Sequence, residues 1–417
     1  MMIIAAVKGL QIIDSRGNPT VKAYITLNDG SVHSSSVPSG ASIGVHEAKE
    51  LRDLDPKHFF GQGVRHAIEN IETHIRKAII GKRIDSPRMI DEVMLRLDHT
   101  SNKSVIGANS MLAVSQAMLK AAAFASNIPL WKYINDYYFP QVQPSYPRLF
   151  INVINGGRHA NWSFDIQEFV IAPKKNIPSV SVRVGVEIFQ SIKRELIKRK
   201  LSILVGDEGG ESPQLESNEE VFELIRKSAL SVNYTLGVDY DFGIDSAASQ
   251  LFQDGRYFFK KDNIKLSSEG LIERYKKYID DFHISFFEDP FAEDDWEAFV
   301  MFTKISENKY VVIGDDLFAT NIERIEKGIK INAAGGIIIK PNQIGTILET
   351  VEAIKLAKSA GWVVIISHRS GDTEDTFIAD LAYGCGADFI KTGSMSRSER
   401  LAKYNRLLEI EFFESGV

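Results

Sequence analysis

The stretches Ile337-Ile338-Ile339-Lys340 and Val363-Val364-Ile365-Ile366-Ser367-His368 decide the fold of this chain. Each is a short apolar run that ends on an ionisable residue, and Lys340 and His368 lie 28 positions apart. A buried strand does not hold a charge in its middle, but its carboxyl end can present one to a pocket that several strands share. The pattern therefore predicts two strands that deliver Lys340 and His368 to one pocket.

Four further apolar runs have the same form. They end at Asp245, Glu288, Asp315 and Lys391. From Glu288 onward the five ends are 23 to 28 residues apart, which is room for one strand and one returning helix. The wider step from Asp245 to Glu288 contains Phe252-Gln253-Asp254-Gly255-Arg256-Tyr257, a hairpin signal. This spacing predicts a (β/α) barrel with its site at the carboxyl ends of the strands.

The length predicts two domains, because 417 residues exceed what one hydrophobic core usually serves. Three prolines between Pro140 and Pro147 mark the predicted boundary. Residues 1–138 are predicted to form an α+β domain, and residues 139–417 the barrel that carries the site. The first domain is expected to begin with an antiparallel sheet over Ile3–Val7, Thr20–Leu27 and Ser31–Val37.

Composition limits the function classes. A net charge of −6 with no block of lysine and arginine argues against nucleic acid or an anionic membrane as partner. The single cysteine, Cys385, excludes an intramolecular disulfide framework and predicts a cytoplasmic location. Met1 to Val7 is apolar but lacks a basic leader, so a first strand is expected there and no membrane span elsewhere.

Asp245, Glu288 and Asp315 place three carboxylates at successive predicted strand ends. Around one axis they would repel one another unless a cation lay between them. Oxygen-only ligands without a nearby cysteine favour a hard ion such as Mg²⁺. The alternative is that each carboxylate caps the next helix or pairs with a lysine.

Lys340 and Lys391 are expected at the barrel mouth. A lysine with the ordinary pKa of about 10.4 is a poor base at neutral pH, although burial and neighbouring cations can lower that pKa. The alternative for both side chains is a plain ion pair with Asp315 or Glu288.

Two acidic residues form a second candidate group. Gly206-Asp207-Glu208-Gly209-Gly210 can turn the Glu208 carboxylate inward, and Gln167-Glu168 begins a strand-like run. Two neighbouring carboxyl groups suggest that one is held protonated and acts as an acid. Alone, the Glu208 segment also suits an ordinary surface turn.

The segment His368-Arg369-Ser370-Gly371 follows a predicted strand and could grip a phosphate. An ion pair of Arg369 with Asp372 or Asp375 is equally compatible with it. Ser39–Gly44 and Asn155-Gly156-Gly157-Arg158-His159 are glycine-rich loops long enough to move.

Taken together, these segments resemble the enolase family over nearly the whole chain. The quoted motifs are joined by others, which are Asp14–Val21, Gly107-Ala108-Asn109, Asn152–Gly157, Glu288-Asp289-Pro290-Phe291, Gly314-Asp315-Asp316-Leu317, Asn342-Gln343-Ile344-Gly345 and Lys391-Thr392-Gly393. The run from His368 to Asp380 and the ending Arg397–Asn405 are the most specific. The resemblance implies an α/β fold, an enolase-type eight-stranded (β/α) barrel whose second strand is antiparallel, with an N-terminal α+β capping domain.

The resemblance also implies a Mg²⁺-dependent hydro-lyase that interconverts 2-phosphoglycerate and phosphoenolpyruvate. Lys340 would take the C2 proton, and Lys391 would pair with the substrate carboxylate. Glu208, helped by Glu168, would protonate the departing hydroxyl. The remaining substrate contacts would come from Gln167, His159, His368, Arg369 and Ser370.

The resemblance implies two Mg²⁺ ions, the first held by Asp245, Glu288 and Asp315 and the second by Ser42. It further implies a homodimer at least. Several positions beside the functional groups depart from the usual family pattern, and these are Ile43, Arg158, Asn161-Trp162, Glu211-Ser212, Pro341 and Ser394-Met395-Ser396.

Two other functions fit parts of this pattern. One is another dehydratase or a racemase of the same superfamily. Such an enzyme would not need the combination of Ser42, His159 and Arg369-Ser370. The other is a non-catalytic binding protein of the family, for which a missing base or metal carboxylate would be expected. No such residue is missing.

Overall fold

The computed structural model describes residues 2–40 and 44–416, and its N-terminal part is a sheet covered by helices. The three strands are β1 (Ile4–Ile13), β2 (Pro19–Leu27) and β3 (Val32–Ser36), paired antiparallel in chain order. The first strand runs to Ile13 rather than ending at Val7 as predicted. Its second half pairs with the start of β2, where Ile12 faces Thr20, so backbone pairing extends the strand beyond its apolar run.

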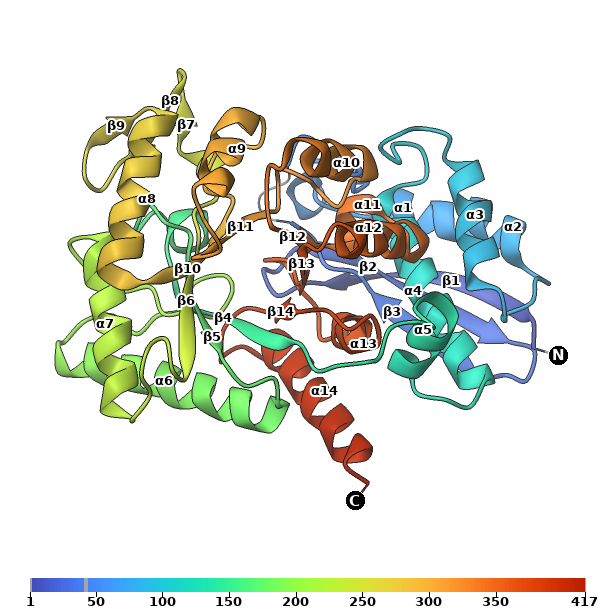
Figure 1. The fold of residues 1–417 in the computed structure, drawn as a ribbon. Helices are drawn as coiled ribbons and strands as arrows, with labels where there is room; N and C mark the ends of the chain where they lie inside the picture. The colour runs from blue at the N-terminus through green and yellow to red at the C-terminus, as the bar shows by residue number, and fades with distance from the viewer. Residues whose placement is uncertain (1, 41–43, 417) are drawn as a thin grey trace.

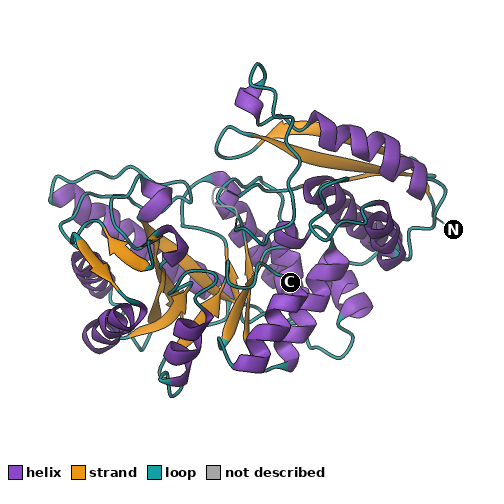
Figure 2. Ribbon diagram, turned by 90° about the horizontal axis from the view of Figure 1, so that it is seen from above, coloured by secondary structure: helices purple, strands orange, loops and turns teal. Residues whose placement is uncertain are grey.

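Five helices complete this N-terminal unit, and Figure 2 shows helices lying along its sheet. They are α1 (Arg65–Asn70), α2 (Arg76–Ile79), α3 (Pro87–Leu97), α4 (Ala108–Ala125) and α5 (Leu130–Tyr138). Helix α4 is buried on nearly all sides because it packs on β2 and β3 and also contacts α11 and α12 of the barrel. It therefore joins the two parts of the molecule.

The C-terminal part is a closed barrel of eight strands, confirming the predicted fold (Figure 1). The strands are β4 (Arg148–Asn155), β5 (Glu168–Pro173), β6 (Tyr240–Asp245), β10 (Ile284–Glu288), β11 (Val311–Gly314), β12 (Gly336–Ile339), β13 (Val363–Ser367) and β14 (Phe389–Lys391). Strand β5 is antiparallel to both of its neighbours, β4 and β6, whereas the other pairs are parallel. The second barrel strand is therefore reversed, as expected.

Helices surround the barrel strands. They are α6 (Pro178–Lys198), α7 (Asn218–Ser231), α8 (Ser268–Phe282), α9 (Trp296–Lys304), α10 (Ile322–Ile331), α11 (Pro341–Ile344), α12 (Ile347–Ser359), α13 (Phe377–Gly384) and α14 (Ser398–Glu414). The apolar face of α12 is buried through Ile347, Val351 and Ile354. Ile344 lies in the short α11, because Gly345 with φ 101° ends that helix.

Large side chains close the barrel interior. Phe150, Phe286 and Phe389 meet edge to face, with ring centroids 5.2 to 5.8 Å apart. Ile313, Ile338 and Ile365 complete this buried cluster. Because the interior is packed, a substrate has access only to the carboxyl ends of the strands.

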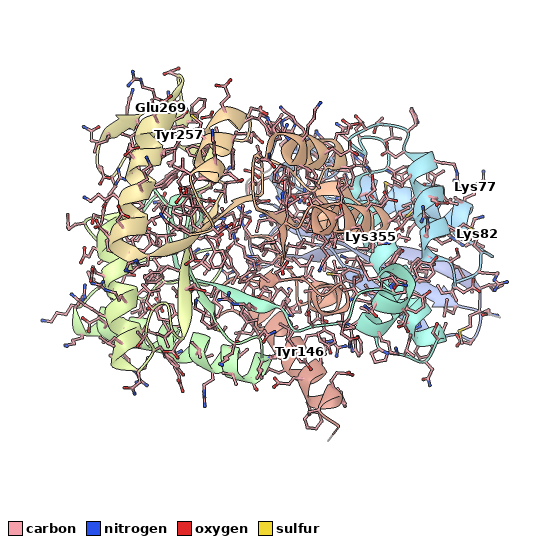
Figure 3. The ribbon with its side chains drawn as sticks, in the orientation of Figure 1. Lys77, Lys82, Tyr146, Tyr257, Glu269 and Lys355 are labelled. Atoms are coloured by element: carbon pink, nitrogen blue, oxygen red, sulfur yellow. The ribbon has the colours of Figure 1, made fainter. Side chains whose placement is uncertain are left out.

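The predicted hairpin lies between β6 and β10. It consists of β7 (Phe252–Gln253) and β8 (Arg256–Phe259), with a third strand β9 (Ile264–Leu266). Tyr257, labelled in Figure 3, anchors it, since its hydroxyl donates to Asp295 at 2.7 Å and accepts from the Ala292 amide at 3.0 Å. Within residues 2–40 and 44–416, no helix combines the length and apolar character needed to cross a membrane.

Candidate active site

Most of the predicted site residues that the structure describes line one cavity at the carboxyl ends of the barrel strands, and Glu288 lies beside them against Lys391. Asp245, Glu288 and Lys391 are the last residues of β6, β10 and β14, while Asp315, Lys340 and His368 directly follow β11, β12 and β13. Fifteen described residues line the cavity, which are His159, Gln167, Glu168, Glu208, Asp245, Ala247, Asp289, Asp315, Asp316, Lys340, Ser367, His368, Arg369, Ser370 and Lys391. The structure thus brings together segments more than two hundred residues apart in sequence.

Lys391 lies at the centre of the carboxylates. Its ammonium group is 2.7 Å from both carboxylate oxygens of Glu288, 3.1 Å from Glu168 and 3.2 Å from Asp245. Burial lowers the pKa of Lys391, but the charges of Glu168, Glu288 and Asp245 outweigh burial and raise that pKa well above its ordinary value. This lysine is therefore a permanent cation, suited to hold a substrate carboxylate.

Lys340 forms a buried ion pair with Asp315. Burial lowers the pKa of Lys340, but Asp315 more than offsets that effect, so the pKa lies above its ordinary value. The expectation that burial and neighbouring cations lower this pKa is wrong for this state of the site. The ion-pair alternatives are observed, Lys340 with Asp315 and Lys391 with Glu288, and the lysines become available only when those carboxylates are engaged elsewhere.

The three predicted metal carboxylates do not converge on one point in this arrangement. Asp245 and Glu288 face Lys391, and Asp315 faces Lys340. The side chains that bring ligand atoms within 4.8 Å of one another are Asp289, Asp315 and Asp316 in one group and His159, Glu168 and Glu208 in another. In the first group, both oxygens of Asp289 already accept amide hydrogens, from Asp315 and Asp316, each at 2.8 Å.

The chemistry of these residues nevertheless fits a hard divalent cation. Burial, followed by the charge of Asp245, raises the pKa of Glu288 to about 8. Burial and the charge of Asp315 raise the pKa of Asp316 to about 8. A raised pKa shows that the surroundings of a buried carboxyl group disfavour its ionised form, and a bound cation would stabilise that form. Oxygen atoms are also the ligands that Mg²⁺ prefers. Asp245, Glu288 and Asp315 can hold such an ion once they release the two lysines.

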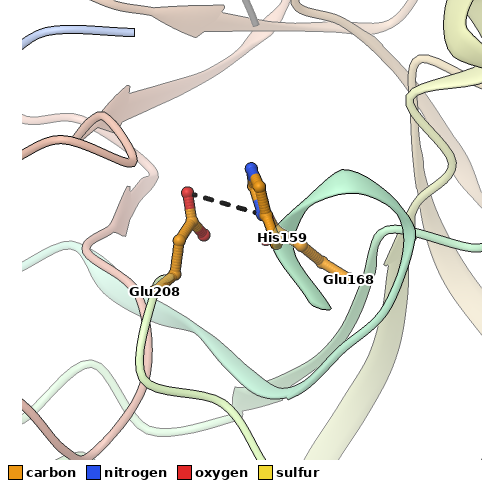
Figure 4. A group of neighbouring side chains, drawn as sticks. All are labelled: His159, Glu168 and Glu208. Atoms are coloured by element: carbon orange, nitrogen blue, oxygen red, sulfur yellow. Dashed lines mark ion pairs between the residues drawn. The ribbon is translucent and has the colours of Figure 1, made fainter. Parts of the chain in front are cut away.

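Figure 4 shows His159 beside Glu208 and Glu168, the predicted acid pair. Its Nδ1 is 3.6 Å from Glu168 and 3.7 Å from Glu208. Burial and the charge of Glu208 raise the pKa of Glu168 well above its usual range. Burial also opposes ionisation of Glu208, but His159, His368 and Arg400 outweigh it and lower the pKa of Glu208 well below its usual range. Of these two carboxyl groups, the surroundings therefore favour the protonated form of Glu168 and the ionised form of Glu208.

The Arg369 guanidinium is buried and paired with a residue that the sequence analysis missed. It donates to the Glu47 carboxylate at 2.6 and 3.0 Å and to Asn342 at 3.1 Å. The alternative pairing of Arg369 with Asp372 or Asp375 is wrong, since Lys403 lies 3.1 Å from Asp372 and Lys120 lies 2.7 Å from Asp375. Glu47 follows the glycine-rich loop of the N-terminal domain, so the two domains meet at the predicted phosphate grip.

Gln167 and its neighbours complete the floor of the cavity. Gln167 donates to Asp245 at 3.4 Å and accepts from Gln250 at 3.1 Å. Gln343, another residue that the analysis missed, donates to Asp315 at 3.0 Å. Gln343 directly follows Asn342 in the motif Asn342-Gln343-Ile344-Gly345. Its position three residues after Lys340 could have identified it as a residue of the site.

The divergent positions have different surroundings. Ser42 and Ile43 lie outside the described residues. Arg158 is exposed, and Trp162 is covered by the Lys260 ammonium at 4.0 Å from its ring. Pro341 is the first residue of α11, where its fixed φ suits a helix start.

Among the positions that depart from the usual family pattern, Glu211 has the clearest physical consequence. It is fully buried, and neither of its carboxylate oxygens has a hydrogen-bond partner among the described residues. Burial raises the pKa of Glu211 to about 7. Its backbone lies between Val153 and Asn155 of β4, so this titrating group sits at the end of the loop that carries Glu208.

Two family models match the chain. Residues 4–134 match the enolase N-terminal domain, and residues 144–414 match the enolase C-terminal TIM barrel domain. The chain belongs to the enolase family. This family is one of enzymes of the lyase type that act on small molecules and typically bind Mg²⁺. The predicted boundary at residues 138 and 139 falls between the two matched segments and stays a prediction.

Proposed function

We propose that this enolase-family chain interconverts 2-phosphoglycerate and phosphoenolpyruvate plus water. One observation carries the proposal, which is that a base candidate, an acid pair and a phosphate grip line the same cavity. Lys340 is the base candidate, Glu168 and Glu208 are the acid pair, and Arg369 with Ser370 is the grip. A carboxylate substrate that bears a phosphate on one side and a leaving hydroxyl on the other would use all three.

Removal of the C2 proton is the difficult step. It adds a second negative charge next to the substrate carboxylate, so the proton is very weakly acidic. Mg²⁺ held by Asp245, Glu288 and Asp315 would supply concentrated positive charge at that carboxylate. Lys340 accepts the proton once its pair with Asp315 opens, because only the neutral amine is a base. A lysine or histidine base together with one or two Mg²⁺ ions is the general pattern of enolase-superfamily sites.

Lys391 would take the substrate carboxylate in place of its present partners. Its ammonium group already meets three carboxylates at 2.7 to 3.2 Å, so a substrate carboxylate exchanges one anionic partner for another. As charge builds up on that group in the transition state, the contact strengthens. The closing loop with Ser42, the proposed ligand of a second Mg²⁺, lies outside the described residues.

Loss of hydroxide would use the acid pair on the opposite side. Hydroxide is a poor leaving group and departs as water after it receives a proton. Glu208 faces the cavity beside His159 and His368, and the proton held by Glu168 is available through the same cluster. We infer that Glu208 delivers the proton and that Glu168 resupplies it. His159 would close over the phosphate that Arg369 and Ser370 hold.

The test is the growth of ultraviolet absorbance from phosphoenolpyruvate when the purified chain meets 2-phosphoglycerate, with and without Mg²⁺. Mg²⁺-dependent growth is expected. If 2-phosphoglycerate is inert while a non-phosphorylated hydroxy acid loses its α-proton, the chain is a different superfamily dehydratase or racemase. If no acid tested exchanges its α-proton, the chain is a non-catalytic family member. Its glycolytic role, cytoplasmic location and homodimeric state stay predictions.

A further inference from the structure

Arg400, at the start of α14, is the largest fully buried side chain of the described residues. Its guanidinium donates to the carbonyl oxygens of Arg369 at 2.6 Å and Asp207 at 3.1 Å, and also to that of Ser370. It also lies 3.3 Å from the Ser15 hydroxyl and 3.3 Å from the Glu399 carboxylate, and it contacts a ring nitrogen, Nδ1 of His368, at 2.6 Å. The sequence analysis gave this arginine no role.

The contact with Arg400 fixes where the His368 proton lies. A guanidinium is always protonated and has no acceptor, so at 2.6 Å Nδ1 of His368 must be the acceptor. Nδ1 therefore carries no hydrogen, and a neutral ring must carry its hydrogen on Nε2. An imidazolium would set two donors against each other at this distance.

Burial keeps the ring neutral. The charged groups that face His368 are Glu208, Arg400 and Asp372, and burial together with Arg400 outweighs the two carboxylates. As a result the pKa of His368 is lowered to about 4. At neutral pH the ring is then the uncharged form with its hydrogen on Nε2.

Nε2 of His368 lies beside the proposed acid. It is 3.4 Å from Oε2 of Glu208, a contact that does not form a hydrogen bond in the described arrangement, and the Asn152 amide donates to the same oxygen at 3.3 Å. The other oxygen, Oε1, is the one that lies near His159, at 3.7 Å. One oxygen of Glu208 thus accepts from Asn152 and lies nearest to His368, while the other lies on the side of His159.

We propose that Arg400 is a positioning residue that fixes His368 as the Nε2–H tautomer, so that His368 donates to Glu208 and orients it for proton transfer. The inference rests on the proposed function for its catalytic consequence, but the tautomer itself does not. If Arg400 serves only to tie Ser15, Asp207 and Ser370 together, the His368 tautomer should not depend on it.

The direct test is the ¹⁵N spectrum of the full chain labelled at histidine. The chain has nine histidines, and the His368→Asn variant identifies the resonances of His368. At pH 7 we expect an unprotonated Nδ1 and a protonated Nε2. A protonated Nδ1, in either a neutral ring or an imidazolium, would overturn the proposal, and this measurement needs no variant of Arg400.

Two substitutions then separate positioning from packing. Arg400→Met removes every donor and should give a mixture of tautomers, whereas Arg400→Lys keeps one donor and should retain the Nε2–H form. Arg406→Met on the same helix, which loses its pairs with Asp380 and Glu409, is the matched control and should leave the spectrum unchanged. If folded Arg400→Met keeps a pure Nε2–H tautomer, Arg400 is not its cause.

The kinetic consequence is specific to one step. In Arg400→Met, loss of hydroxide from 2-phosphoglycerate should slow by about 10- to 100-fold, while exchange of the C2 proton should stay within about threefold. Arg400→Lys should recover most of the loss. Equal slowing of both steps would show a general structural role. If the unmodified chain does not dehydrate 2-phosphoglycerate, the proposed function fails, but the spectrum still decides the tautomer.

Discussion

Lys340 and Asp315 form an ion pair at the mouth of the barrel, although one is the proposed base and the other a proposed metal ligand. In the proposed reaction Lys340 must be a neutral amine and Asp315 must bind Mg²⁺, and the ion pair prevents both. The pair holds Lys340 protonated and keeps Asp315 away from Asp245 and Glu288. Under the proposed function, this pair must open before the reaction can begin.

Lys340→Ala should abolish exchange of the C2 proton of 2-phosphoglycerate with solvent, by about 10³-fold or more, because the general base is gone. The loss of hydrogen label from C2 in deuterated buffer measures this. Lys330→Ala, an exposed lysine on α10, is the control and should exchange normally. Normal exchange by Lys340→Ala would assign the base elsewhere.

Glu208→Gln should keep C2 exchange within about threefold and slow the loss of hydroxide by about 10²- to 10⁴-fold, since an amide cannot protonate the leaving group. Both rates are measured on the same substrate by label exchange and by absorbance. Glu168→Gln provides the comparison, because burial and the charge of Glu208 raise the pKa of Glu168. If Glu168→Gln alone blocks elimination while Glu208→Gln does not, the two acids have exchanged roles.

Mg²⁺ should stabilise the chain by about 2.7 kcal/mol when its concentration is a hundred times the dissociation constant, because only the folded state gathers the ligands. Thermal unfolding with and without Mg²⁺ measures the gain without any substrate. Asp245→Asn should lose most of it, whereas Asp316→Asn should keep it. The reverse result would place the ion among Asp289, Asp315 and Asp316 rather than in the predicted ligand set.

Glu211 should make the free energy of unfolding depend on pH. The pKa of Glu211 is about 7 in the folded chain, against about 4.5 when exposed, so its contribution is full below about pH 4.5 and is lost as pH rises through 7. Each pKa unit corresponds to about 1.4 kcal/mol, so the difference between about 4.5 and about 7 corresponds to at most about 3 kcal/mol.

Denaturant unfolding at pH 5 and pH 8 checks this prediction. Glu211→Gln should flatten the pH dependence, since the amide does not titrate. Glu216→Gln, an exposed neighbour in the same segment, should leave the dependence as it is. An unchanged slope in Glu211→Gln would show that the buried carboxyl stays in one protonation state throughout.

The spacing of apolar runs was enough to predict the barrel, its six ionisable strand ends and the hairpin between β6 and β10. Alternation and strand length are local properties, so they can be recognised in one sequence. The length of β1 could not be predicted in this way, because its second half is held by pairing with β2 rather than by its own apolar residues. The family likeness added the antiparallel second strand.

The sequence by itself determined which side chains stand at the carboxyl ends of the strands, because each follows directly from the end of a buried run. Only the tertiary structure decided how those side chains pair, with Arg369 on Glu47, His368 on Arg400 and Lys340 on Asp315. These contacts join residues 25 to 322 positions apart, and they fix pKa values and tautomers through distance and burial. Distance and burial exist only once the chain has closed into the barrel and its cap.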